Sequence, residues 1–207
     1  MKNQIITSII ANSQKELDER IRKVNSKIFQ LDIMDGKFVK NKSLLFDFKA
    51  PKGKKYEAHL MIKNPEYWIE RNWKKVDSIV FHIEAVKNPD KIIGLIKGKR
   101  KKVGIAINPK TKIGKIKIHL DEIDFVIVMT VNPGKYGSKF IPAMLNKVRQ
   151  IKEIKPNLEI EVDGGVNGKT ILLAKKAGAN RFVSGSYIQN SENPQKAFEK
   201  LKKIANA

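Results

Sequence analysis

The chain contains no cysteine, few arginines and no long apolar run. The lack of cysteine excludes disulfides, thiolate nucleophiles and cysteine-ligated zinc, so any bound metal must take nitrogen and oxygen ligands. No apolar run reaches the roughly 18 residues of a membrane helix, and the first residues show no charged-then-apolar signal pattern. We therefore expect a cytoplasmic protein without a membrane span or a secretory signal.

Negative charge is also scarce, because 42 Lys and Arg residues stand against 21 Asp and Glu residues, for a net charge of +21. Such a charge ordinarily favours nucleic acid or an anionic membrane as a partner. Only six of the basic residues are arginine, however, and specific base or phosphate recognition relies on arginine. The densest lysine runs, 52–55 and 97–102, fall between predicted elements. We interpret them as solvated loops, with non-specific polyanion binding or steering of an anionic substrate as the alternatives.

Short β-branched runs alternate with amphipathic stretches along the 207 residues. We predict strands at 5–10, 27–33, 56–62, 77–82, 102–107, 123–131, 158–162 and 181–184. Caps such as Asn12-Ser13 and Asn64-Pro65 indicate helices between them, with weaker helix candidates at 44–48 and 109–117. Eight strand–helix units without a flexible linker predict one α/β domain over residues 1–207, a single (β/α)8 TIM barrel. An open doubly wound sheet would need a Gly-x-Gly-x-x-Gly motif after its first strand, and none is present.

Two carboxylates end predicted strands on the side where a barrel carries its chemistry. Asp32 and Asp163 close the second and seventh strands, so they would face each other across the mouth of the barrel. Opposed carboxylates suit removal of a proton next to a carbonyl and its return to the other face, which inverts that carbon. His59 ends the strand beside Asp32, and a histidine with two carboxylates can hold a divalent cation. The alternative is that the aspartates only make turns and His59 lies in a polar core.

Glycine-containing loops follow the last three predicted strands, at Gly134 to Ser138, Gly164-Gly165 and Gly185-Ser186. Phosphate sites of barrels are often built there, because glycine lets backbone N–H groups approach an anion. Each loop taken alone could be an ordinary turn. Their position after consecutive strands favours a phosphate site.

Other strand ends carry residues with two interpretations. Met34, Met61 and Met129 are either core residues or an apolar, polarizable cap over a bound sugar. For His82 we predict a buried, hydrogen-bonded side chain rather than a metal ligand.

Several segments closely resemble those of the ribulose-phosphate 3-epimerase family, and they occur in order over nearly the whole chain. The matching segments are Leu31 to Gly36 with Phe38-Val39, His59 to Met61, Phe81 to Ala85, Asn108-Pro109 with Thr111, Val128 to Gly134 and Val162 to Gly165. The resemblance implies a (β/α)8 barrel that reversibly epimerises D-ribulose 5-phosphate to D-xylulose 5-phosphate at C3. It also implies a homo-oligomer, because the family forms dimers and larger rings.

The resemblance further implies roles for individual residues. Asp32 and Asp163 would be the acid/base pair and, with His59, would bind a divalent metal ion. Ser8 would touch the substrate, and the three glycine loops would hold its phosphate.

Two positions depart from the family pattern. Gln30 stands where the family has a histidine that is the fourth metal ligand, and a neutral amide oxygen suits zinc less well than imidazole does. We therefore rank three hypotheses: a harder ion such as Mn, Fe(II) or Mg replaces Zn; Gln30 hydrogen-bonds the enediolate with little metal; or catalysis is lost.

The second departure is in the loop after the sixth strand. The family pattern Gly-Phe-Gly-Gly-Gln is here Gly134-Lys135-Tyr136-Gly137-Ser138. Tyrosine rarely adopts the positive φ that glycine tolerates, so we expect a different backbone there, and we expect Lys135 to pair with the phosphate.

Two rivals to a ribulose 5-phosphate epimerase remain open. One is an epimerase for a six-carbon ketose phosphate of the allulose 6-phosphate type. The other is a non-catalytic barrel that binds sugar phosphates or polyanions.

Overall fold

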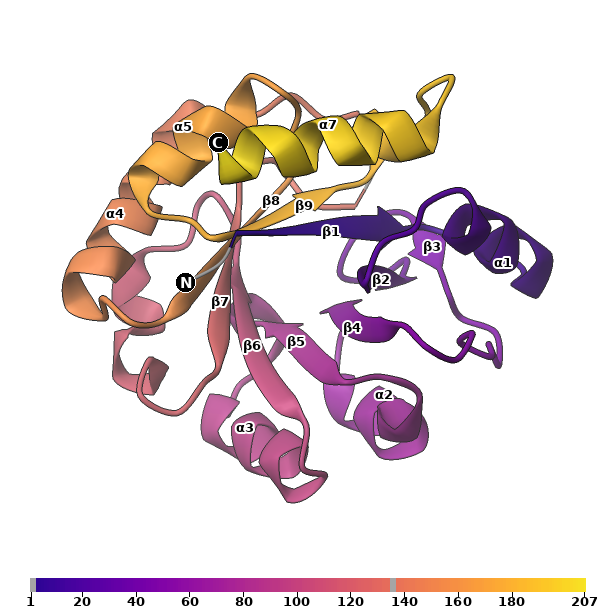
Figure 1. Ribbon diagram of the computed structural model, residues 1–207. Coiled ribbons are helices and arrows are strands. Elements are labelled where there is room, and N and C mark those ends of the chain that lie inside the picture. The colour runs from indigo at the N-terminus through magenta and orange to yellow at the C-terminus, as the bar shows by residue number, and fades with distance from the viewer. Residues whose placement is uncertain (1–2, 135–136) are drawn as a thin grey trace.

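Eight parallel strands close into a barrel in the computed structural model, which describes residues 3–134 and 137–207 (Figure 1). The strands are β1 (Gln4–Ile9), β2 (Ile28–Asp35), β4 (Lys55–Met61), β5 (Ser78–His82), β6 (Lys102–Ile107), β7 (Phe125–Met129), β8 (Glu159–Asp163) and β9 (Arg181–Ser184). β1 pairs with both β9 and β2, which closes the ring. A short strand, β3 (Lys42–Ser43), runs antiparallel to the end of β2. The predicted (β/α)8 barrel is thereby confirmed.

Helices surround the strands on the outside of the barrel (Figure 1). They are α1 (Gln14–Arg22), α2 (Pro65–Asn72), α3 (Pro89–Gly98), α4 (Leu145–Ile154), α5 (Thr170–Ala177), α6 (Ser186–Gln189) and α7 (Pro194–Asn206). Short 3-10 turns lie at Trp73–Lys75, Ile83–Ala85, Ile113–Lys115, Lys117–His119 and Pro142–Met144. Ser13 caps α1 as predicted, because its side chain accepts the Glu16 N–H. No helix in the described ranges is long and apolar enough to cross a membrane.

Two helix predictions are wrong. Residues 44–48 form no helix, because Leu44 has a φ of 53° and its N–H donates to the Ala11 carbonyl rather than into a helical turn. Leu44 and Phe48 are both only 1% exposed, so burial of these two side chains sets the path of the segment. The segment 109–117 contains short 3-10 turns in place of one weak helix.

Alternation along the strands gives the barrel two distinct apolar clusters. Outward-facing side chains such as Leu31, Leu60 and Val162 pack under the helices in the larger cluster. A smaller cluster fills part of the barrel interior and consists of Val80, Ala106, Phe125, Ile127, Met129 and Val131. Other inward positions on β2, β4 and β8 carry the polar side chains of Gln30, Asp32, Glu57, His59, Glu161 and Asp163, which places chemistry inside this barrel.

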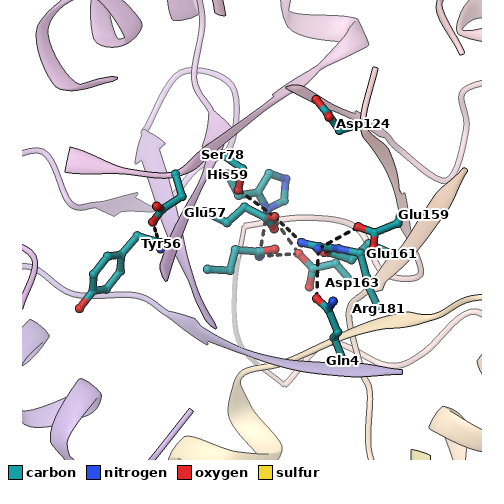
Figure 2. A network of polar contacts seen from close by, with 12 residues as sticks. Gln4, Tyr56, Glu57, His59, Ser78, Asp124, Glu159, Glu161, Asp163 and Arg181 are labelled. Atoms are coloured by element: carbon teal, nitrogen blue, oxygen red, sulfur yellow. Dashed lines mark hydrogen bonds and ion pairs between the residues drawn. The ribbon is translucent and has the colours of Figure 1, made fainter. Parts of the chain in front are cut away.

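A buried ion network occupies the end of the interior where the strands begin (Figure 2). The Arg181 guanidinium donates to Glu57 at 2.6 Å, to Glu161 at 2.7 Å and to Glu159 at 3.2 Å. Its central carbon also lies 4.4 Å from the centre of the Phe125 ring. Burial, followed by the neighbouring Glu57 carboxylate, raises the pKa of Glu161 well above its usual value. We infer that Glu161 keeps its proton in the folded protein, so that it adds no negative charge beside Arg181.

This network should make stability depend on pH. Because the pKa of Glu161 is raised in the folded state, the folded protein binds the extra proton, and the free energy of unfolding falls as the pH rises above about 4.5. We expect Glu161→Gln to remove this component, which is at most about 1.4 kcal/mol per pH unit. Urea titrations between pH 5 and 8 measure the difference. Glu159→Gln, at the more exposed partner of the same arginine, should keep the wild-type slope, and an unchanged slope in Glu161→Gln would contradict the inference.

Candidate active site

A cavity that is partly open to solvent lies at the end of the barrel where the strands finish. Its lining contains Ser8, Ile10, Asp32, Met34, Met61, Met129, Val131, Pro133, Gly134, Gly137, Ser138, Asp163, Gly164, Gly165, Val166, Val183, Gly185 and Ser186. All but two of the described site residues predicted from the sequence are therefore in its wall. The exceptions, Gln30 and His59, are fully buried beneath it. Lys135 and Tyr136 lie outside the described residues.

The carboxylates of Asp32 and Asp163 are brought together by the side chain of Gln30. The Gln30 amide nitrogen donates to Asp32 Oδ1 and to Asp163 Oδ2, both at 2.8 Å. All three residues point inward, from β2 and β8. The two carboxylates that the sequence placed at strand ends thus face one small volume at the floor of the cavity.

His59 completes this floor. Its Nδ1 lies 3.4 Å from Asp32 Oδ1, 3.3 Å from Asp163 Oδ2 and 3.2 Å from Gln30 Nε2. The Gln30 amide has only two hydrogens, and its two 2.8 Å bonds to the aspartates use both. The His59 Nδ1 therefore carries its own proton toward the carboxylates.

The pKa values of His59 and Asp32 are both raised. Burial opposes charge on His59, but the hydrogen bonds and charges of Asp163 and Asp32 prevail and raise its pKa to about 10. Burial, then the Asp163 charge, raises the pKa of Asp32, although its contacts with His59 and Gln30 act in the opposite direction. His59 therefore carries a positive charge at neutral pH when no cation is bound.

Asp32, His59 and Asp163 also fit a divalent cation. Ligand atoms around a tetrahedral ion with bonds of about 2.1 Å lie about 3.4 Å apart, and His59 Nδ1 lies 3.4 and 3.3 Å from the two aspartate oxygens. The three donor atoms all lie within 4.8 Å of one another. A cation bound there would displace the Nδ1 proton.

The side chain of Gln30 fits a cation in only one orientation. Its nitrogen faces the three donors, while its Oε1 is buried and has no hydrogen-bond partner among the described residues. A turn of the amide would bring this oxygen to the cation and would break both bonds to the aspartates. The sequence predicted the amide oxygen as a ligand, and this role stays a prediction that requires such a turn.

The glycine loops form the other side of the cavity. Gly164 and Gly165 have φ values of 113° and 66°, and a Cβ at Gly164 would lie 2.4 Å from a Val131 methyl group. A Cβ at Gly165 would lie 2.9 Å from the Phe140 backbone nitrogen, so both positions require glycine. Among the described residues of the lining there is no lysine or arginine. Backbone N–H groups and serine hydroxyls are thus the donors that this part of the cavity offers an anion.

His82 is fully buried and hydrogen-bonded, as predicted. Its ring stacks on that of His59, with centroids 5.0 Å apart, and the Phe38 ring covers it at 4.8 Å. The sequence did not predict that Glu84 contacts His82, whose Nδ1 lies 3.3 Å from the Glu84 carboxylate. The His-x-Glu spacing at the end of a strand was the available signal.

Comparisons with known proteins point to one family. A profile of the ribulose-phosphate 3-epimerase family matches residues 4–189. The chain is 38% identical to the ribulose-phosphate 3-epimerase of Methanocaldococcus jannaschii, over 98% of this chain and 91% of that protein. It is 35% identical to that of Bacillus subtilis, over 88% of each. Among solved structures, 3-keto-L-gulonate-6-phosphate decarboxylase from Vibrio cholerae has a TM-score of 0.72 at 12% identity, over 99% of this chain and 98% of that one, which shows a shared fold.

Proposed function

Because the chain belongs to the ribulose-phosphate 3-epimerase family and is an isomerase of that family, we propose that it interconverts D-ribulose 5-phosphate and D-xylulose 5-phosphate at C3. One observation supports this most strongly. Two carboxylates from β2 and β8 converge on the floor of one cavity, where a single amide bridges them. An epimerisation needs two proton-transfer groups on opposite faces of one carbon, and in this proposal Asp32 and Asp163 would be those groups.

The aspartates carry the proton transfers in the proposed mechanism. One carboxylate removes the C3 proton next to the C2 carbonyl, and the other delivers a proton to the opposite face of the resulting enediolate. The raised pKa of Asp32 suits the member of the pair that begins a cycle as the acid, with Asp163 as the base. In the reverse direction the two residues exchange roles.

We propose that Asp32, His59 and Asp163 hold one divalent cation, with Gln30 as a conditional fourth ligand. The cation would stabilise the negative charge that develops on the substrate oxygens as the proton leaves. The protein's own residues would remove and return the proton, orient the sugar under Met34, Met61 and Met129, and exclude water from the floor of the cavity. We propose Mn, Fe(II) or Mg rather than Zn as the ion, because Gln30 offers an amide oxygen.

The phosphate of the substrate would lie against the glycine loops. We propose that the loops at Gly134 to Ser138, Gly164-Gly165 and Gly185-Ser186 donate backbone N–H groups to it, with Ser8 and Ser186 as side-chain contacts to the substrate. Asn41 ties the loop after β2 to this region, because its side chain donates to the Gly134 carbonyl at 2.6 Å.

We also propose a cytoplasmic homo-oligomer that does not bind nucleic acid specifically. The large apolar side chains of Leu45 and Tyr67 are 55% and 67% exposed, and both line a groove beside α2. A second copy of the chain would cover such a surface.

Proton NMR in D2O tests the proposed reaction. The protein is first treated with a chelator, then supplied with Mn, Fe(II), Mg or Zn and incubated with D-ribulose 5-phosphate. We expect loss of the C3 proton signal together with formation of xylulose 5-phosphate, faster with Mn or Fe(II) than with Zn. Absence of exchange with every ion would overturn the five-carbon assignment, and a six-carbon ketose phosphate assayed in parallel would then show whether chain length is the error.

A further inference from the structure

A line of polar contacts leads from His59 past the end of β5 to the loop that follows β6. His59 Nε2 lies 2.9 Å from His82 Nε2, and His82 Nδ1 lies 3.3 Å from Glu84 Oε2. Both imidazoles are fully buried, so neither can exchange these partners for bulk water. Every nitrogen of the two rings therefore faces a defined group.

The far end of this line is fixed by a loop. Glu84 Oε1 accepts the Asn108 N–H at 2.9 Å and the Thr111 hydroxyl. Lys147 holds the same loop, because its ammonium group donates to the carbonyls of Asn108 at 2.9 Å, Pro109 at 2.8 Å and Thr111 at 2.7 Å. Burial opposes charge on Glu84, but the hydrogen bonds that it accepts from His82, Thr111 and Asn108 prevail and lower its pKa to about 2. Glu84 is thus a carboxylate that can only accept.

The carboxylate determines the direction of every hydrogen bond in the line. Since Glu84 only accepts, His82 Nδ1 must carry the hydrogen that lies between them. A neutral His82 then has a lone pair on Nε2, and this lone pair accepts the hydrogen on His59 Nε2. The reverse arrangement would set the lone pair of His82 Nδ1 against the lone pairs of the carboxylate. His59 therefore keeps its hydrogen on Nε2 and turns Nδ1 toward Asp32 and Asp163.

We propose that His82 and Glu84 are positioning residues, which fix the tautomer and the ring orientation of His59 so that Nδ1 serves the acid/base pair and its cation. The loop at 108–111, held by Lys147, sets the place of Glu84. This inference extends the proposed function and depends on it, because it assumes that His59 is a metal ligand. Hydrogen-bond acceptors behind a ligating histidine commonly raise metal affinity by fixing the tautomer and orientation of its ring.

Glu84→Gln tests the proposal. The new amide oxygen should stay with the Asn108 N–H and the Thr111 hydroxyl, so its NH2 group would face His82 Nδ1 and force that atom to accept. The hydrogen would then move to His82 Nε2, and His59 Nε2 would have to accept it. The hydrogen on His59 Nδ1 would then be the last on the ring, so a cation could displace it only by leaving an imidazolate anion. We expect the Kd for Mn to rise about 10- to 100-fold. In the metal-free protein, nitrogen-15 NMR of the imidazoles should show His59 Nε2 losing its hydrogen.

Controls separate positioning from a general loss of structure. Asp77→Asn alters a carboxylate that accepts the Tyr56 N–H at 2.8 Å near the start of the strands, and it should keep the wild-type Kd for Mn. If Glu84→Gln does not fold, His82→Phe replaces the ring without its nitrogens, and it should weaken Mn binding to a similar degree.

Two outcomes decide the question. A wild-type Kd and wild-type imidazole nitrogen signals in Glu84→Gln, or a wild-type Kd in His82→Phe, would overturn the positioning role. Wild-type protein that fails to epimerise while the variants lose metal affinity as expected would overturn the proposed function and support the positioning role.

Discussion

Asp163→Asn should abolish epimerisation while solvent exchange at C3 of one epimer continues. Loss of a general acid or base lowers kcat by about 10²- to 10⁴-fold, and here a second group of the same kind remains at Asp32. That group can still remove and return the C3 proton of the epimer that it faces. We expect deuterium to enter this epimer in D2O with no inversion, which proton NMR of each substrate, incubated separately, detects.

Asp32→Asn provides the matched comparison, because it should show exchange only in the other epimer. The pattern also distinguishes loss of proton transfer from loss of the cation, since both aspartates are candidate ligands. Loss of the cation alone would stop exchange in both epimers. Epimerisation at the wild-type rate in either variant, or exchange of the same epimer in both, would contradict the assignment of the two carboxylates as a pair.

The convergence of this pair could be predicted from the sequence. Alternation along a strand places Asp32 inward whenever Leu31 and Ile33 pack outward, and both of these are fully buried under the helices. The closed barrel then brings the ends of β2, β4 and β8 to one mouth, which collects His59 and Asp163 there. These predictions depended only on strand period and on strand order.

Features that depend on side-chain rotation or on burial of single residues could not be predicted. The Gln30 amide turns its nitrogen to the donors because two carboxylates surround it, and no sequence pattern encodes that rotation. The contact between His59 and His82 arises because β4 and β5 are neighbours with His59 beside Val80, which sets the two rings face to face. At Leu44 a helix does not form despite the residue's helical propensity. A left-handed backbone conformation there allows the side chain to be buried, and this burial is favoured over the helix.

Gln30→His should change the metal preference of the site more than any other single substitution. In the wild-type protein a cation meets two obstacles. The amide must turn and lose two hydrogen bonds to carboxylates, each of a kind worth about 1.5–3 kcal/mol, and it then offers only a neutral oxygen. An imidazole at this position removes both obstacles. We expect the Kd for Zn to fall by more than the roughly 10- to 100-fold that is typical of changes behind a ligand.

Gln30→Ala separates the two obstacles, because it removes the amide without supplying a new ligand. If the bridging amide mainly keeps cations out, Gln30→Ala should bind Zn at least as tightly as the wild-type protein. If the amide turns and its oxygen binds the cation, Gln30→Ala should bind Mn and Zn more weakly. Competition titrations against a chelator of known affinity measure both variants, and an unchanged Kd for Zn in Gln30→His would show that residue 30 does not control the metal. Zn binding by Gln30→Ala at least as tight as in the wild-type protein would mean that the Gln30 amide takes the place of a cation. Its two N–H groups would then hold Asp32 and Asp163 together when no ion is bound.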